Sequence, residues 1–218
     1  MSNTTCILCA MKTEAKPFLE ALEEVTVSKY GRLSVCEGLL DGERVLLAYG
    51  AIGVEKAAAA ARLLIERSTP QCLIMSGTAG GIDNNLEIGD TVVALETVYH
   101  DRDNEELFAA DDNLIKRCQR GLEEHPPPHP VSFGRIATGK DFVKKSQRAS
   151  IIRRLNPAGV DMESAAVAEV CKDQGVPFLA IRSISDTEAK AGFVVFFKNA
   201  LFASRHSFVV TRTLLQSR

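Results

Sequence analysis

Short apolar runs without polar alternation recur along this chain, and most of them are followed by a segment with helical periodicity. Such runs are typical of strands that are buried on both faces, because a strand with one face in water alternates between apolar and polar residues. Buried strands that alternate with helices form a parallel or mixed sheet covered by helices on both sides. We therefore predict an α/β fold of three layers, α/β/α, around a central, mixed and twisted sheet.

The bounds of the expected elements follow from the apolar runs, the turn residues and the helix caps. Strands are expected at 4–11, at two segments within 32–49 that meet in a hairpin at Asp41-Gly42, at 71–76, at 91–95, before 139 and at 178–181. Helices are expected at 12–24, at 54–67, within 107–122, directly after 163, after 186 and at 208–215.

The composition is that of an ordinary globular chain. Its 218 residues are 45% hydrophobic and 25% charged, which allows a large core. We expect one domain over residues 1–218, because α/β folds of this length are routinely single domains. The net charge of -2 and the lack of a charged tail disfavour a nucleic-acid partner. No apolar run approaches the ~20 residues of a membrane helix, and the N-terminal segment does not resemble a secretory signal. We expect a cytoplasmic protein without membrane association.

The cysteines and histidines give no sign of a metal or redox centre. Cys6 and Cys9 form a C-x-x-C pair, but no second pair follows, and the pair lies inside an expected strand rather than at a helix N-terminus. We interpret the six cysteines as buried packing residues. The four histidines show no ligand spacing, and His100 and Asp101 are strand neighbours whose side chains point to opposite faces. We expect no metal.

Three carboxylates stand where expected strands end, namely Glu14, Glu163 and Asp186. An ionised side chain near a core costs several kcal/mol unless it is paired or has a function. In α/β sheets ligands bind at the carboxyl ends of the strands. Because the three acids are far apart in sequence, only the fold can bring them together, and we predict that they meet in one active site.

Two further strand ends carry residues suited to ligand contact. The stretch Gly77-Thr78-Ala79-Gly80-Gly81 consists of small residues that let backbone amides approach a ligand closely. It matches neither the dinucleotide-binding nor the phosphate-loop pattern, so it indicates a ligand loop of no particular class. Phe142 follows another strand end, and either a core position or a ligand contact explains it.

Taken in order, several segments resemble the successive motifs of the purine nucleoside phosphorylase/uridine phosphorylase superfamily, most of all the 5'-methylthioadenosine/S-adenosylhomocysteine nucleosidase branch. The resemblance spans nearly the whole chain, and its specific parts are the Met162-Glu163 pair and the ending Ile184-Ser185-Asp186. The segments are Ala10-Met11 through Glu14, Ser76 to Gly81, Ile88 to Val93, Thr138-Gly139 with Phe142, Val160 to Ala166 and Arg182 to Asp186.

The resemblance implies a nucleoside phosphorylase-like fold. It also implies hydrolysis of the N-glycosidic bond of an adenine-type nucleoside, such as methylthioadenosine or S-adenosylhomocysteine, without a cofactor. Asp186 matches the general acid that protonates the leaving base, with Ser185 as its hydrogen-bonding neighbour, and Glu14 matches the group that activates water. An acid of this kind needs a pKa raised by burial or a nearby charge.

The resemblance further implies a set of substrate-binding residues and an assembly. Glu163 and Met162 hold the ribose, Phe142 and Val143 the adenine, and the remaining residues Thr78, Ala79, Gly80, Asp161 and Arg182 shape the site. The expected partners are a small nucleoside and other copies of the chain, most simply in a homodimer.

Two departures from the family pattern leave alternatives open. Lys12 precedes Glu14 where the nucleosidases carry acids, and the segment after Asp101 is short, so the 5'-substituent and the usual dimer contact stay open. Phosphorolysis is the alternative reaction; it requires cations for phosphate, for which Lys12, Lys16 or Arg44 are candidates. A non-catalytic nucleoside-binding protein and a plain nucleotide-binding module are the alternatives from other classes.

Overall fold

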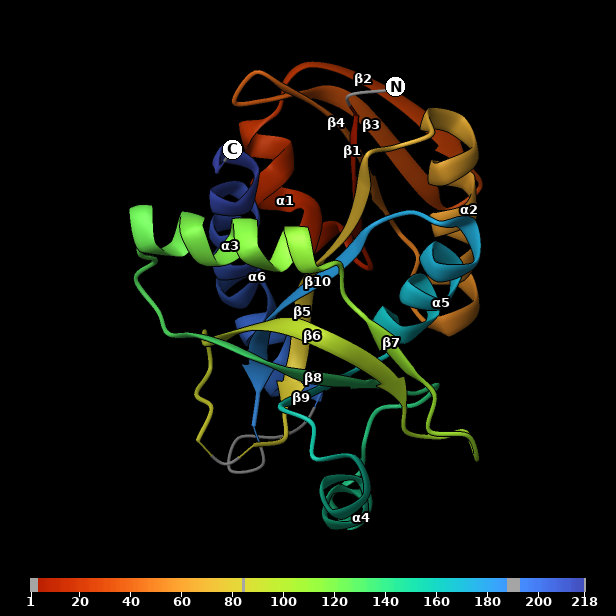
Figure 1. Ribbon diagram of the computed structural model, residues 1–218, viewed down its shortest axis with the longest axis vertical. Helices are drawn as coiled ribbons and strands as arrows, with labels where there is room; N and C mark the ends of the chain where they lie inside the picture. The colour runs from red at the N-terminus through yellow and green to blue at the C-terminus, as the bar shows by residue number, and fades with distance from the viewer. Residues whose placement is uncertain (1–3, 84, 188–192, 218) are drawn as a thin grey trace.

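The computed structural model describes residues 4–83, 85–187 and 193–217. All ten strands belong to one mixed sheet with the order β10-β6-β8-β9-β5-β1-β4-β3-β2, and β7 is paired to β6 (Figure 1). The strands are β1 (Thr5–Cys9), β2 (Glu23–Tyr30), β3 (Leu33–Leu40), β4 (Glu43–Tyr49), β5 (Cys72–Gly81), β6 (Thr91–Tyr99), β7 (Leu107–Ala109), β8 (Val131–Thr138), β9 (Gly159–Asp161) and β10 (Phe178–Asp186). The helices are α1 (Lys12–Ala21), α2 (Val54–Ser68), α3 (Asp112–Glu124), α4 (Lys145–Leu155), α5 (Ser164–Gln174) and α6 (Phe193–Gln216).

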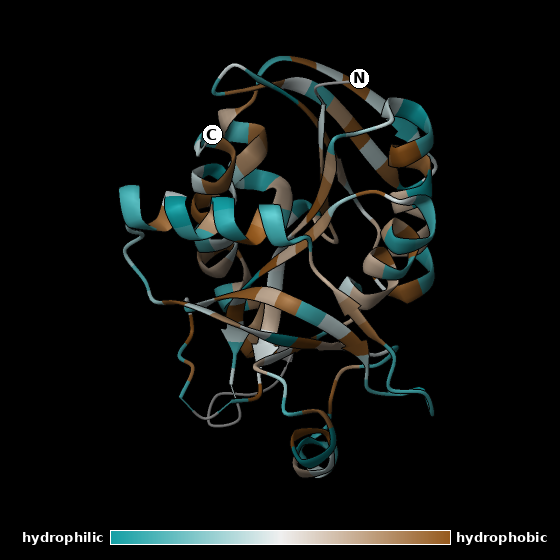
Figure 2. Ribbon diagram, viewed as in Figure 1, coloured by the Kyte–Doolittle hydropathy of each residue, from teal (hydrophilic) through white to brown (hydrophobic). Residues whose placement is uncertain are grey.

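Helices cover the sheet on both sides, as predicted. In Figure 1 α1, α3 and α6 lie on one side, and α2 and α5 lie together on the other. Figure 2 shows that the outward surface of α3 is hydrophilic, whereas the strands beneath it are largely apolar. Each side has its own buried cluster, one built on Phe18 of α1 and Val210 of α6, the other on the alanines of α2.

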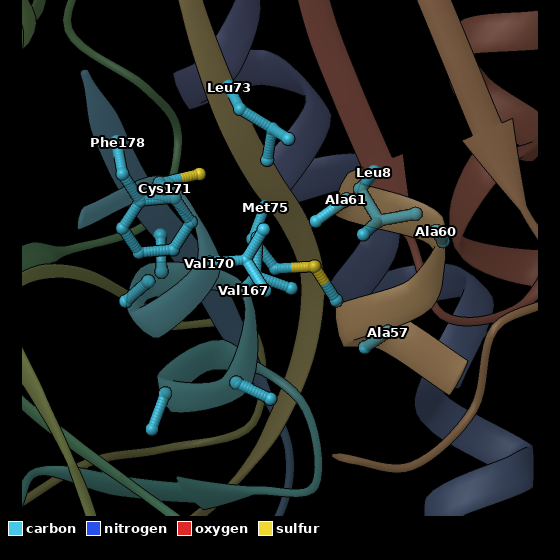
Figure 3. Close-up of a cluster of buried hydrophobic side chains, with 14 of the residues drawn as sticks. Leu8, Ala57, Ala60, Ala61, Leu73, Met75, Val167, Val170, Cys171 and Phe178 are labelled. Carbon is cyan, nitrogen blue, oxygen red and sulfur yellow. The ribbon is translucent and has the colours of Figure 1, made fainter. Parts of the chain in front are cut away.

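The alanine-rich sequence of α2 lets this helix pack closely on the sheet and on α5. In Figure 3 Leu73 and Met75 of β5 lie between the α2 alanines and Val167 and Val170 of α5. Leu73 and Met75 are completely buried, and replacing such a side chain with alanine typically costs about 2–5 kcal/mol. This packing fixes β5, whose C-terminal end carries the small-residue loop.

Several expected bounds are corrected by the structure. The helix predicted at 12–24 ends at Ala21, and the polar segment that follows is the edge strand β2, which is exposed along most of its length. Periodicity missed this strand because neither of its faces is buried. The two helices expected after 186 and at 208–215 are parts of α6, and α4 was not predicted because its sequence is basic and carries few apolar residues.

The half of the sheet that carries β5 closes on itself. Strand β10 pairs with both β5 and β6, and β6, β8, β9 and β5 follow in the sheet order, so these five strands form a ring. Closure brings the ends of β5, β9 and β10 together, because Gly80 pairs with Val160 on one side and with Asp186 on the other.

One sheet runs through the described residues, but the single-domain boundary 1–218 stays a prediction. Among the residues described, no helix combines the length and apolar character that crossing a membrane requires.

Candidate active site

A cavity opens at the ends of β1, β5, β9 and β10. Apolar and aromatic side chains line it together with a small number of polar groups, as is typical of small-molecule sites. The residues that line it are Ala10, Met11, Glu14, Ile52, Thr78, Ala79, Gly80, Asp141, Phe142, Val143, Arg148, Val160, Asp161, Met162, Glu163, Asp186, Phe196 and Phe197. The three predicted carboxylates therefore share one cavity.

Glu14 is held in place by three hydrogen bonds. Its Oε1 accepts from the backbone N and from Oγ1 of Thr78, both at 2.8 Å, and its Oε2 accepts from the backbone N of Met11 at 2.9 Å. The last of these bonds caps the first turn of α1. The side chain is almost fully buried, so its carboxylate is fixed between the start of α1 and the loop of β5.

Gly77 lets the side chains of Glu14 and Arg182 approach each other, because it has no side chain of its own. A Cβ atom at this position would lie 2.5 Å from Oε1 of Glu14 and 2.8 Å from Nη1 of Arg182. A side chain here would displace one or both, so the glycine is required by close approach. Nη1 of Arg182 is buried and has no hydrogen-bond partner among the described residues, which leaves a donor facing Glu14.

Arg182 is completely buried behind the cavity wall and is paired with two acids. Its Nε donates to Oδ2 of Asp161 at 2.8 Å, and its Nη2 donates to Oε2 of Glu163 at 2.9 Å. A buried ion pair is stable only when its remaining polar atoms are also satisfied. The other carboxylate oxygen of Glu163 accepts from the backbone N of Gly53 at 2.9 Å.

The carboxylate of Asp161 has enough partners to remain charged. It accepts hydrogen bonds from Oγ1 of Thr138 at 2.6 Å and from the backbone N of Ser164, which caps the start of α5. Burial alone would raise the pKa of Asp161, but Arg182 and the hydrogen bonds from Ser164 and Thr138 together lower it.

Glu163 is in the opposite situation. Burial raises its pKa to about 7, because the attraction of Arg182 does not offset desolvation and the repulsion from Asp161 and Glu14. Burial alone would lower the pKa of Arg182. The carboxylates of Asp161, Glu163 and Glu14 raise it by more than burial lowers it, so the guanidinium stays charged.

Asp186 reaches the cavity through an irregularity in β10. Ile184 pairs with Ala79 and Asp186 with Gly80, so Ser185 is an extra residue on this strand. A bulge of this kind bends a strand and redirects its side chains. Burial raises the pKa of Asp186, while the hydrogen bond from Oγ of Ser185 at 3.1 Å and the charge of Arg148 partly oppose this effect. The carboxyl group therefore holds a proton to higher pH than an ordinary aspartate.

Aromatic side chains form the outer wall of the cavity. Phe142 is 40% exposed, and its ring lies edge-on to Phe196 with 6.4 Å between the centroids. Phe196 contacts Phe197 in the same manner at 5.1 Å. Phe142 therefore lines the cavity and is not part of the core, and its contact with a ligand stays a prediction.

The predicted site residues are brought together with two exceptions. Glu14, Thr78, Ala79, Gly80, Phe142, Val143, Asp161, Met162, Glu163 and Asp186 line the cavity. Arg182 lies behind Asp161 and Glu163, and Ser185 lies behind Asp186, so these two contact the wall residues instead.

Sequence reasoning missed other lining residues, chiefly Ile52, Arg148, Phe196 and Phe197. Ile52 lies between Gly50 and Gly53, a turn with a weak motif. Arg148 lies on α4, a basic helix whose weak apolar signal, Ile151, Ile152 and Leu155, was overlooked. The adjacent Phe196 and Phe197 could have been noticed as a rare aromatic pair, although helical periodicity explains them equally well.

The short segment after Asp101 folds back onto α5. The guanidinium carbon Cζ of Arg102 lies 3.3 Å from the centroid of the Tyr99 ring. Nη1 of Arg102 pairs with Oε1 of Glu169 of α5 at 3.2 Å. Phe108 packs edge-on against Tyr99 with 6.0 Å between the centroids. The shortened segment therefore covers a helix of its own chain.

No group of three or more potential metal ligands occurs in the described part of the chain. All six cysteines are free and buried. Burial raises the pKa of the Cys6, Cys9 and Cys171 thiols well above the ordinary value, which makes them unreactive.

Comparison with known proteins gives consistent matches. A family model described as the phosphorylase superfamily matches residues 4–207. The 5'-methylthioadenosine/S-adenosylhomocysteine nucleosidase of Anoxybacillus flavithermus is 33% identical over 216 residues, which cover 92% of this chain and 93% of the relative.

Solved structures agree with the family match. The nucleosidase of the same name from Neisseria meningitidis, in complex with methylthio-immucillin-A, superposes with a TM-score of 0.92. It is 30% identical in sequence, and the match covers 99% of this chain and 100% of that one. The corresponding nucleosidase from Colwellia psychrerythraea 34H, in complex with adenine, gives a TM-score of 0.92 and 29% identity over 100% of this chain and 96% of that one. The predicted fold class is thereby confirmed.

Proposed function

This chain belongs to the phosphorylase superfamily, and we propose that it hydrolyses the N-glycosidic bond of an adenine nucleoside such as methylthioadenosine or S-adenosylhomocysteine. The observation that carries the proposal is the convergence of Glu14, Glu163 and Asp186 on one cavity. The fold does not require three acids at the ends of separate elements, and glycoside cleavage through a cationic sugar does use carboxylates in this way.

Asp186 is the general acid of the proposed reaction. It donates its proton to N7 of the purine, so that the base leaves as a neutral molecule when the bond between C1' and N9 breaks. The raised pKa of Asp186, caused by burial, supports this role because a general acid is effective only if it is protonated at working pH.

Glu14 is the base that activates water. Its carboxylate takes a proton from the water whose oxygen forms the new bond to C1'. Nη1 of Arg182 lies behind the cavity wall on the side of Glu14 and has no hydrogen-bond partner in the described residues, so its charge acts on Glu14 and not through contact with the water. Asp161 orients Arg182, and Thr78 orients Glu14.

Glu163 accepts hydrogen bonds from the ribose hydroxyls, and Met162 packs against the sugar. Together with Glu14, the carboxylate of Glu163 stabilises the positive charge that develops on the ribose in the transition state. The apolar ring of Phe142 stacks on the adenine, and the Val143 backbone contacts its edge. The reaction requires no cofactor.

Water is favoured over phosphate as the nucleophile by the charges around Glu14. Of the described residues that line the cavity, Arg148 alone is a cation, and it lies by Asp186 rather than by Glu14. The guanidinium of Arg182 is next to Glu14 but lies behind the cavity wall, where Asp161 and Glu163 already pair with it. Lys12 is exposed, while Lys16 and Arg44 are paired on the surface with Glu20 and Glu37. A dianionic phosphate beside Glu14 would be repelled.

The test is release of free base from methylthioadenosine, S-adenosylhomocysteine, adenosine and inosine, each with and without inorganic phosphate. We expect adenine release that is independent of phosphate. Strict dependence on phosphate would establish phosphorolysis instead, and no release from any of the four would favour a binding protein. A cytoplasmic location and a homodimer are parts of the proposal, and sedimentation of the purified chain tests the second of them.

A further inference from the structure

Arg148 is a buried cation in the wall of the cavity, and the reaction described above does not use it. Only 5% of the residue is exposed. It comes from α4, an element separate from those that carry the three carboxylates. Because burying a guanidinium costs several kcal/mol, its location inside a ligand cavity calls for a functional explanation.

The contacts of Arg148 place it at the Asp186 end of the cavity. Its Nη2 donates a hydrogen bond to the carbonyl oxygen of Gly81. The preceding residue, Gly80, pairs with Asp186 in the sheet, and a Cβ atom on Gly80 would lie 3.5 Å from both carboxylate oxygens of Asp186. Arg148 is therefore anchored to the strand end that faces the general acid.

Among the described residues that line the cavity, Arg148 is the one cation that can stabilise the carboxylate of Asp186. The other ionisable groups in the described cavity wall are all acids, so none of them can stabilise that carboxylate: Glu14 of α1, Asp141 of the loop after β8, Asp161 of β9 and Glu163 at the start of α5. The charge of Arg148 lowers the pKa of Asp186.

We propose that Arg148 is a positioning residue that fixes the strand end at Asp186 and stabilises the carboxylate which Asp186 becomes after its proton has passed to the leaving purine. This inference rests on the proposed function, and it explains how a buried acid can release a proton. The proton moves from Asp186 to the base, and the guanidinium of Arg148 offsets the negative charge that is left on Asp186.

The variant that separates charge from anchoring is Arg148→Gln, because glutamine retains a donor for the Gly81 carbonyl but carries no charge. Arg148→Lys retains the charge, and Arg153→Gln removes an exposed cation from the same helix as a matched control. Arg148→Met serves in place of the glutamine variant if the latter does not fold, as judged by circular dichroism.

The first measurement is the pH dependence of kcat and kcat/KM for adenine release from methylthioadenosine. Loss of a nearby cation raises the pKa of a carboxylic acid, so the alkaline limb of the Arg148→Gln profile should move upward by about one pH unit. The plateau of kcat should fall about tenfold, the factor that corresponds to one pKa unit. Arg148→Lys should restore most of both changes, and Arg153→Gln should match the wild type.

Combination with Asp186→Asn tests whether Arg148 acts through this residue. In that background Arg148→Gln should have no further effect on kcat, because the carboxylate that it stabilises is absent. A further tenfold loss would overturn the proposal. An unchanged alkaline limb in Arg148→Gln would also overturn it, whether kcat falls, KM rises or neither changes.

Calorimetric titration with adenine provides a measurement that does not require turnover. Adenine affinity should weaken at high pH as Asp186 loses its proton, and in Arg148→Gln this weakening should begin about one pH unit higher. If the wild type releases no base but this shift occurs, the proposed reaction is wrong and the role of Arg148 stands. If base is released and the shift is absent, only the role of Arg148 is wrong, whereas failure to bind adenine at any pH overturns both.

Discussion

Arg182 donates from Nη2 to Oε2 of Glu163 across 2.9 Å, and both side chains are almost wholly enclosed by protein. The same guanidinium pairs with Asp161, whose side chain is also enclosed. One buried cation therefore pairs with two acids. One of these, Asp161, also accepts a hydrogen bond from the backbone N of Ser164 at the start of α5. The Glu163 side of the cavity depends on this arrangement.

We expect Arg182→Met to destabilise the protein by about 3–5 kcal/mol, because it leaves two buried carboxylates without their cation. Urea unfolding followed by circular dichroism measures the loss. The matched control is Arg212→Met, which breaks an ion pair with Asp41 that is partly exposed and should cost at most about 1 kcal/mol. Equal losses of stability in the two variants would show that burial does not increase the contribution of the Arg182 ion pairs to the free energy of unfolding.

Asp186→Asn should lower kcat by about 10²–10⁴-fold, the usual contribution of a general acid. Its affinity for adenine should change by less than about tenfold, or 1.4 kcal/mol, because the amide can still donate to N7. Steady-state kinetics and calorimetry measure the two quantities. Asp173→Asn, an exposed change on α5, is the control, and near-normal turnover in Asp186→Asn would show that another group protonates the base.

Glu14→Gln should also lower kcat by about 10²–10⁴-fold, and it should cost about 1–3 kcal/mol of stability, because the amide nitrogen cannot accept the hydrogen bond that Oε2 of Glu14 takes from the backbone N of Met11. The glutamine oxygen can still accept both hydrogen bonds from Thr78, but it cannot take a proton from water. Kinetics with methylthioadenosine provide the measurement, and Glu20→Gln, on the exposed side of the same helix, provides the control. If Glu14→Gln retained activity when phosphate is added, phosphorolysis would become the better description.

The acids at the strand ends could be predicted because a charged residue next to an apolar run is unusual. Glu14, Glu163 and Asp186 are charged residues next to apolar segments, and the resemblance to a family confirmed by the comparisons gave each of them an expected role. In each case the signal is local in sequence, although the convergence itself depends on the way β10 closes the ring of strands.

Other features could not be predicted because they arise only when distant segments meet. Arg148 lies in a basic stretch in which Ile151, Ile152 and Leu155 alone mark the buried face of a helix, and nothing in the sequence indicates that an arginine on this helix is buried. The extra residue at Ser185 becomes visible only in the register between β10 and β5. The edge strand β2 has no buried face and therefore no alternation for periodicity to detect.

The last prediction concerns the pH dependence of stability at Glu163. Burial raises the pKa of this group from the ordinary value of 4.5 to about 7 in the folded protein. Between these values the folded state binds a proton that the unfolded state lacks. The contribution of Glu163 to the free energy of unfolding must therefore fall as the pH rises from 4.5 to 7, and it stays low above 7.

Comparison of the wild type with Glu163→Gln isolates this contribution, because glutamine does not titrate and resembles the protonated acid. We expect the stability of Glu163→Gln relative to the wild type to increase over this window by on the order of 3 kcal/mol, from the one-unit equivalence of 1.36 kcal/mol. Asp161 does not interfere, since its lowered pKa confines its effect to lower pH. Urea unfolding at half-unit steps from pH 5 to pH 8 measures the difference. A constant difference across this range would mean that Arg182 keeps Glu163 ionised throughout, and the carboxylate would then be ready to bind the ribose hydroxyls at every pH tested.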